Sequence, residues 1–182
     1  GTGVTQLFLE SSDYIQRITD IRKKLAGEGM LMPVVRIMDQ MRLPEHDFVI
    51  LSFDKVLHHD TVTKEEGIEK ILNALEDTVR KKYGEIVTND LLKQILSNLK
   101  KRFPTLIEGV VPEKISYTLL RNVMKGFMEG GNSFWYLPKV IEIVDSALTD
   151  DPSLHTKDLV EIVKNDICTK GNFTLWLHER NL

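Results

Sequence analysis

The sequence predicts an α+β fold: a small sheet subdomain with the order β-α-β-β-α over residues 6–83, a four-helix subdomain over 84–170, and a terminal strand over 171–182. Short β-branched or alternating apolar runs occur near the start and the end of the chain, whereas apolar residues at the three-to-four spacing of a helix face fill the middle. The composition, 42% hydrophobic and 28% charged over 182 residues, is that of an ordinary globular protein with a core.

The chain opens with a predicted strand and a predicted helix. Residues 6–10 contain the apolar run Leu-Phe-Leu, which we interpret as a short strand. The side-chain oxygens of residues 11–13 can then cap a helix. Its apolar positions between Tyr14 and Leu25 recur every three or four residues, and Gly27 ends it.

Two antiparallel strands and a covering helix complete the predicted sheet subdomain. Residues 34–38 and 48–53 are rich in β-branched or aromatic residues, and residues 44–47 provide turn material between them. The apolar residues of segment 64–83 mark one helical face, with charged residues on the other. After Gly84 nearly every segment has a helical pattern, so we place the subdomain boundary there.

The second half of the chain predicts four helices and a final strand. Thr88 and Ser116 can cap the first two helices, and glycines or prolines end the helices. The first two predicted helices run from Thr88 to Leu99 and from Ser116 to the glycines at 130–131. The third starts at Ser133 or Tyr136 and reaches Leu148, and the fourth starts at Ser153 or Thr156 and ends before Gly171. Within residues 171–182, Phe173, Leu175 and Leu177 alternate with other residues as in a strand. This strand either joins the first sheet or opens a further domain, and the sequence leaves both open.

Charge and cysteine content exclude several classes of protein. The chain has 24 Lys and Arg against 27 Asp and Glu, so its net charge of -3 gives no positive field for nucleic acid. Cys168 is the sole cysteine, which excludes an intrachain disulfide and a cysteine-rich zinc site. No apolar run reaches the roughly 18 residues of a membrane span. Because residues 1–3 resemble neither a signal peptide nor a natural start, we expect a piece of a longer protein.

Few residues of the sequence are candidates for catalysis, phosphate binding or metal binding. No glycine-rich phosphate loop is present. His58, His59 and Asp60 form the only tight cluster that could bind a metal or transfer protons, but adjacent imidazoles on a strand would point to opposite faces. We interpret the cluster as a solvated loop, and Asp150 and Asp151 as a turn before a helix. We therefore expect no catalytic residue, no cofactor and no metal site.

The aromatic triplet Phe134, Trp135 and Tyr136 is the candidate partner-binding site. Three consecutive aromatic residues around a helix start cannot all point inward, so at least one could lie on the surface. Exposed aromatic side chains anchor protein contacts. In the alternative interpretation, all three are partly buried where helices meet. The sequence favours neither.

Several short motifs punctuate the chain in a fixed order. Residues 15–50 contain Arg-Lys-Lys-Leu, Met-Pro-Val-Val-Arg-Ile-Met-Asp and Arg-Leu-Pro-Glu-His-Asp-Phe. These motifs resemble the start of the cytoplasmic domain of the FHIPEP family, the large export-gate proteins of flagellar and virulence type III secretion systems. The second half resembles it further, through residues 103–107, Val111-Pro112 and Ile115-Ser116. The resemblance runs from about Leu7 to Leu182.

The resemblance implies a protein-docking domain on the cytoplasmic side of the bacterial inner membrane. Its partners would be other export-apparatus proteins and chaperone-substrate complexes. The full-length protein would be anchored in the membrane, and its cytoplasmic domains would form a homo-oligomeric ring.

The chain departs from the family in three places. Family members carry an inserted subdomain after the third strand, which helps to form the cleft for chaperone and substrate complexes, whereas here only residues 55–64 occupy that position. Trp135 and Tyr136 stand where the family usually has an Arg-Asp pair. The chain also stops at the first strand of the family's last subdomain. These departures affect the binding cleft and the contacts of the ring.

Three hypotheses follow. The first is a docking domain of the export gate without catalysis. The second is a stand-alone regulatory or scaffold protein that keeps the fold and has lost secretion. The third is a metal-dependent enzyme that uses His58, His59 and Asp60. The native reading frame separates the first two, and metal analysis tests the third.

Overall fold

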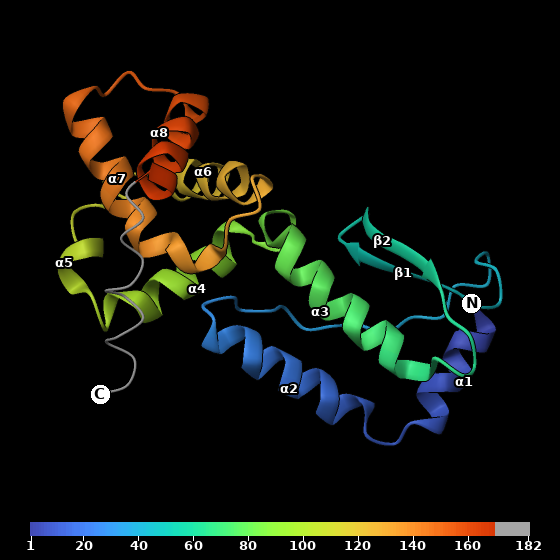
Figure 1. Cartoon of the computed structure of the whole chain (residues 1–182). Coiled ribbons are helices and arrows are strands. Elements are labelled where there is room, and N and C mark those ends of the chain that lie inside the picture. Colours follow the sequence, from blue (N-terminus) through green and yellow to red (C-terminus); the bar gives the residue numbers. More distant parts are fainter. Residues whose placement is uncertain (170–182) are drawn as a thin grey trace.

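The computed structural model describes residues 1–169 and confirms the α+β class. In this range eight α-helices and one short 3-10 helix accompany a two-stranded antiparallel sheet (Figure 1). The elements are α1 (Thr2–Glu10), α2 (Tyr14–Gly27), β1 (Asp47–Ser52), β2 (Lys55–Thr61), α3 (Gly67–Ile86), α4 (Asn89–Lys100), α5 (Pro104–Ile107), α6 (Tyr117–Glu129), η1 (Phe134–Tyr136), α7 (Leu137–Asp150) and α8 (Thr156–Thr169).

The first element is a helix, so the strand predicted over residues 6–10 is wrong. Those residues belong to α1. Val4, Leu7 and Phe8 have the spacing of a helix face, and they pack in a small core with Phe48 of β1 and Ile71 of α3. The apolar run was therefore one turn of an amphipathic helix, and the chain begins α-α-β-β-α where the sequence predicted β-α-β-β-α.

The hairpin also differs from the prediction. Residues 34–38 are not paired as a strand, and β1 pairs instead with β2, which lies in the segment expected to be a short connection. The register joins Asp47 to Thr61 and Ile50 to His58. The tight connection through Phe53, whose φ is +53°, brings β1 and β2 together. A short loop costs little closure entropy, so this local pairing competes well with the longer loop back to residues 34–38.

Helices α2 and α3 confirm the two helices predicted for the first half. They lie side by side in Figure 1 and contact each other. Leu25 of α2 and Leu75, Val79 and Tyr83 of α3 are buried in the main core. The Tyr83 hydroxyl donates to the backbone carbonyl of Leu31, at 2.8 Å, and so fixes the chain that leaves α2.

The four helices predicted for the second half are confirmed as α4, α6, α7 and α8. The predicted caps are present: the hydroxyl of Thr88 accepts from the N–H of Leu91, and that of Ser116 from the N–H of Leu119, each at 3.1 Å. The sequence did not predict the short α5 and η1.

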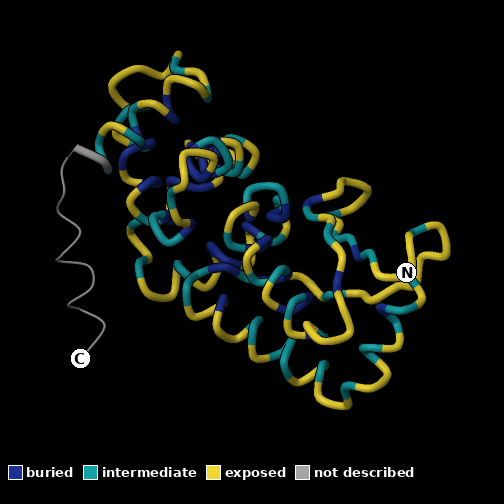
Figure 2. The backbone as a smooth tube through the Cα atoms, turned by 45° about the vertical axis from the view of Figure 1, so that its right-hand side comes forward, coloured by how far each residue is buried: buried dark blue, intermediate teal, exposed yellow. Residues whose placement is uncertain are grey.

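One continuous core crosses the predicted boundary. Its buried residues run from Leu25 to Val163, and Figure 2 shows the buried positions on the inward faces of the helices. Gly84 lies in the last turn of α3, where a Cβ atom would come within 2.9 Å of the Lys125 Cα of α6. This glycine thus allows the first half to pack closely on the second. The division of the chain at Gly84 stays a prediction.

Two remaining predictions concern the chain end and the membrane. The terminal strand expected over 171–182 lies outside the described residues. Across residues 1–169 no helix is long and apolar enough to cross a membrane.

Candidate protein-binding surfaces

The aromatic triplet lies where α3, α6 and the end of α2 meet. The Phe134 side chain is 1% exposed, and its ring meets that of Tyr83 edge-on with centroids 4.7 Å apart. Tyr136 is half-buried and makes a similar contact with Phe127, at 5.6 Å. Phe134 therefore belongs to the core, and only its two neighbours keep exposed surface.

Trp135 lies against the residue that follows α2. Its ring atom Cε3 is 3.8 Å from the position that a Cβ atom on Gly29 would take. Gly29 has a φ of +85°, in the region that favours glycine. The Ser133 hydroxyl accepts from the Trp135 N–H at 3.2 Å and so holds the start of η1. The half-buried Trp135 thus bridges the two halves of the chain.

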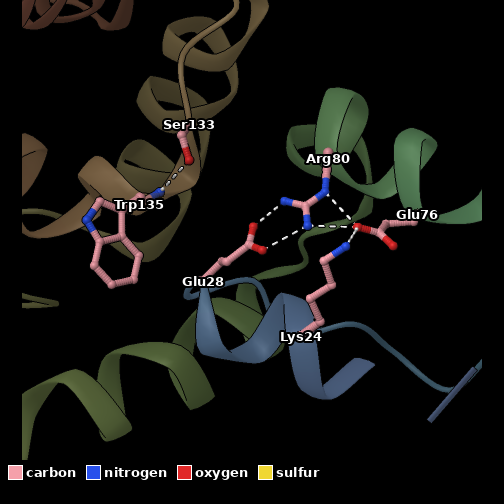
Figure 3. Close-up of polar contacts among 6 residues, drawn as sticks. All are labelled: Lys24, Glu28, Glu76, Arg80, Ser133 and Trp135. Atoms are coloured by element: carbon pink, nitrogen blue, oxygen red, sulfur yellow. Dashed lines mark hydrogen bonds and ion pairs between the residues drawn. The ribbon is translucent and has the colours of Figure 1, made fainter. Parts of the chain in front are cut away.

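A charged network joins α2 to α3 beside this junction (Figure 3). Arg80 donates to Glu28 and to Glu76, and the Lys24 Nζ lies 2.7 Å from the Glu76 carboxylate. The hydrogen bond from Arg80 lowers the pKa of Glu28, and that from Lys24 lowers the pKa of Glu76. The hydrogen bond with Glu28 in turn raises the pKa of Arg80. All four groups are paired with one another, so the network holds α2 and the residue after it against α3.

The histidine cluster lies on β2, and its interpretation as a solvated loop is wrong. His58 is half-buried with its ring 5.7 Å from that of Phe48, and its Nε2 is buried without a hydrogen-bond partner. His59 is exposed, and its Nε2 lies 2.8 Å from the Asp47 carboxylate. The N–H of Thr61 lowers the pKa of Asp60.

The two imidazoles have different neighbours, as expected for adjacent residues of a strand. In the described part of the chain no three His, Cys, Asp or Glu side chains are grouped so that they could hold a metal ion.

Large exposed apolar side chains gather in the first third of the chain. All nine of those in the described residues lie between Leu9 and Val56. We define two groups among them. The hairpin tip consists of Leu51, Phe53 and Val56, of which Phe53 is 79% exposed. The edge segment is residues 33–42, where the exposed apolar side chains are Val34, Ile37, Met38 and Met41.

The edge segment also has free backbone groups. The chain before it is fixed, because Arg22 donates to the carbonyl of Met32. Among the described contacts, no backbone N–H or C=O of residues 33–39 makes a hydrogen bond. An extended chain with unpaired backbone groups is a template for pairing with another chain.

A third feature is a shallow groove of about 470 Å3 between α5 and α7. Its lining is mostly polar and includes Glu142, Asp145 and Thr149. Both carboxylates already have partners, since Lys139 lies 3.0 Å from Glu142 and Lys114 lies 3.1 Å from Asp145. Asp150 is the third carboxylate that lines the groove, and it lies at the exposed end of α7.

Comparison with known proteins gives one informative relative. No family model matches the chain. The flagellar biosynthesis protein FlhA of Helicobacter pylori (strain J99) is 23% identical over 206 aligned positions, which cover 87% of this chain. This match confirms the resemblance to the FHIPEP family. The chain spans 26% of the length of that FHIPEP protein.

The alignment also bears on the insertion that the FHIPEP resemblance predicts. Because 87% of 182 residues is about 158, the 206 aligned positions include about 48 that have no counterpart in this chain. This surplus agrees with an extra segment in the relative. In this chain the connection from β2 to α3 is only residues 62–66.

Neither exposed group is predicted from the sequence. The sequence indicates a paired strand over residues 34–38 and a short connection over residues 55–64. The sequence contains no standard turn signal for this hairpin, because the two residues between β1 and β2 are Phe53 and Asp54 and not a pair such as Asn-Gly or Asp-Gly. Which apolar side chains stay exposed depends on the packing of helices distant in the sequence, and no local pattern records it.

Proposed function

We propose that this chain is a docking part of a type III secretion export gate, and that it binds proteins without catalysing a reaction. Its partners would be export-apparatus proteins and chaperone-substrate complexes on the cytoplasmic side of the inner membrane. The whole protein would be membrane-anchored and would assemble into a ring. The likeness to FlhA supports the secretion role. The exposed apolar side chains support the binding role, because such patches mark interaction sites.

The main structural support for this proposal is the hairpin tip, whose exposed apolar side chains lie on a hairpin that is attached to α3. The Ser52 hydroxyl donates to the Glu85 carbonyl at 3.2 Å, and the Lys55 Nζ lies 2.9 Å from the Glu85 carboxylate. Lys125 pairs with the same carboxylate at 2.8 Å, and its hydrogen bond is the main reason that the pKa of Glu85 is lowered. Phe53 is thus held out from a hairpin that is tied to α3. A preorganised aromatic side chain loses little entropy on binding.

The aromatic triplet remains a second proposed contact. Phe134 is buried, so a partner at this place would touch Trp135 and Tyr136. Such a partner would also lie beside Gly29 at the end of α2. Binding there would therefore act on the junction between the two halves of the chain.

The test is a Phe53→Asp substitution in the native full-length protein. Leu9→Asp is the matched control, because Leu9 is 80% exposed and lies on α1. The start of α1 is fixed near the beginning of β1, where Gly3 donates to the Glu45 carbonyl at 3.0 Å, so α1 lies toward the other end of the hairpin from Phe53. Both variants should fold, because each replaces an exposed side chain.

The readout is the amount of exported protein in the culture medium, with the cellular level of the variant measured by immunoblot. We expect Phe53→Asp to reduce export at least about tenfold, as for a central anchor of an interface, and Leu9→Asp to leave it near the wild-type level. Wild-type export by a normally expressed Phe53→Asp protein would refute the role of the hairpin tip. Undiminished export after deletion of residues 1–169 would refute the secretion role itself.

A further inference from the structure

We propose that the end of α3, residues 82–86, sets the direction of the hairpin tip and couples that tip to α6. The inference rests on the proposed docking role of the hairpin tip and deepens it, because it names the residues that govern how Phe53 is presented. It also gives the second half of the chain a way to act on a surface of the first half.

The hairpin needs support from outside its own two strands. A two-stranded hairpin by itself is only marginally stable in water. In the described residues the sheet consists of β1 and β2 alone. Leu51, Phe53 and Val56 of the tip are exposed, so their side chains give it little anchorage. The direction in which Phe53 points therefore depends on contacts that other residues of the hairpin make with the rest of the chain.

The end of α3 supplies such contacts to both strands. The Lys82 ammonium donates to the carbonyl of Leu57, a buried residue of β2. The backbone carbonyl of Glu85 accepts from Ser52 at 3.2 Å, and the Glu85 carboxylate lies 2.9 Å from the Lys55 Nζ. Residues 82 and 85 are three apart, which is the spacing at which two side chains share a helix face. One face of this segment thus holds the hairpin at β1 and at β2.

The end of α3 has its own direction, because the helix is kinked at Lys82. The backbone angles there are φ −122° and ψ 26°. A regular α-helix has φ of about −63° and ψ of about −42°. Residues 83–86 therefore leave the axis of the longer part of α3. Because the kink lies at the residue that also holds Leu57, it decides where the end of α3 meets the hairpin.

The same segment is fixed to α6. A Cβ atom on Gly84 would lie 2.9 Å from the Lys125 Cα, so the two backbones are in close contact. The Lys125 Nζ lies 2.8 Å from the Glu85 carboxylate, to which Lys55 of the hairpin also binds. In Figure 1 the C-terminal end of α3 lies between the hairpin and α6. A shift of α6 would therefore move the end of α3, and with it the support of the hairpin tip.

The first test measures amide hydrogen exchange of the 182-residue chain at pH 7. Lys82→Met removes the donor to Leu57 and keeps an apolar side chain of similar length. We expect those amides of residues 51–57 that are protected in the wild type to exchange about tenfold faster, which is the factor for a lost hydrogen bond from a charged group. Lys81→Met, which loses an exposed ion pair on the same helix, is the matched control and should exchange like the wild type.

Lys125→Met tests the coupling to α6. In the described chain the Lys125 ammonium pairs with Glu85 and with no residue of the hairpin. This variant should nevertheless speed exchange at the protected amides of residues 51–57 about two- to fivefold, as for the loss of a partly exposed ion pair. Wild-type exchange at these amides in either Lys82→Met or Lys125→Met would overturn the proposal. An equal rise at the amides of α4 would overturn it too, because it would show that the whole chain had been destabilised.

Export by the native full-length protein tests the consequence for docking. Lys82→Met should reduce export at least about twofold in the wild type and should have no further effect in the Phe53→Asp variant, because both changes act through the same side chain. If Phe53→Asp exports normally, the docking role of the tip is refuted whatever the exchange rates are. If Phe53→Asp reduces export and Lys82→Met does not, the docking role stands and the positioning role of Lys82 is refuted.

Discussion

Substituting Gly84 by alanine should destabilise the protein, although alanine is the better helix former. Gly84 lies in α3 where that helix packs on α6. A Cβ atom added there would lie 2.9 Å from the Lys125 Cα and 3.1 Å from the Lys125 Cβ. The nearest atom belongs to backbone, which cannot rotate out of the way as a side chain can. The two helices must therefore move apart, and the core that they share must repack.

The expected size follows from two opposing effects. Replacing glycine by alanine in a helix interior favours the helix by about 1 kcal/mol. Overpacking a tight contact costs about 1–3 kcal/mol. Because the close atom here is backbone, we take the upper part of that range, and the free energy of unfolding should fall by about 1–2 kcal/mol. Gly27→Ala at the end of α2 is the matched control, since a Cβ atom there has nothing within 4 Å.

Urea unfolding, followed by circular dichroism at a helix band, measures both variants. With a denaturant slope of about 2 kcal/mol/M, the midpoint of Gly84→Ala should be about 0.5–1 M lower than that of the wild type. Gly27→Ala should have an unchanged or slightly higher midpoint. If Gly84→Ala were as stable as Gly27→Ala, the close approach of α3 to α6 would not exist as described.

Three further predictions concern the contacts between α2 and α3 and the aromatic triplet beside them. Glu76→Gln should cost about 1 kcal/mol at neutral pH. The hydrogen bond from Lys24 lowers the Glu76 pKa below its ordinary 4.5. This stabilisation is therefore present above pH 4.5 and is lost as the pH falls through the pKa that Glu76 has in the folded protein. The free energies of unfolding of the wild type and the variant, measured by urea titration over a pH series, should converge in acid. Tyr83→Phe removes the donor to a backbone carbonyl and should lower the free energy of unfolding by about 1 kcal/mol, measured by urea titration; an unchanged midpoint would contradict the role of that hydroxyl. Alanine at both Trp135 and Tyr136 should weaken binding of an export-apparatus protein, measured by calorimetry, and intact binding and ring formation would remove the proposed contact.

The sequence by itself determined the helices whose signals are local. Thr88 and Ser116 cap α4 and α6 as predicted, because a hydroxyl at a helix start meets an N–H only a few residues away. The apolar spacing likewise predicted α2, α3, α7 and α8. The order of the motifs also indicated the FHIPEP resemblance that the FlhA match confirms.

Only the tertiary structure decided the outcome of short apolar runs and the exposure of single side chains. Residues 6–10 became helical because Val4 and its neighbours pack against Phe48, which is more than forty residues away. Phe134 is buried against Tyr83, and Phe53 is left exposed, although both are aromatic residues at a turn. A short run fits a strand or a helix about equally well, and burial depends on which distant surfaces meet. Long-range packing therefore decides between helix and strand, and between buried and exposed, and the spacing of apolar residues in the sequence does not record that packing.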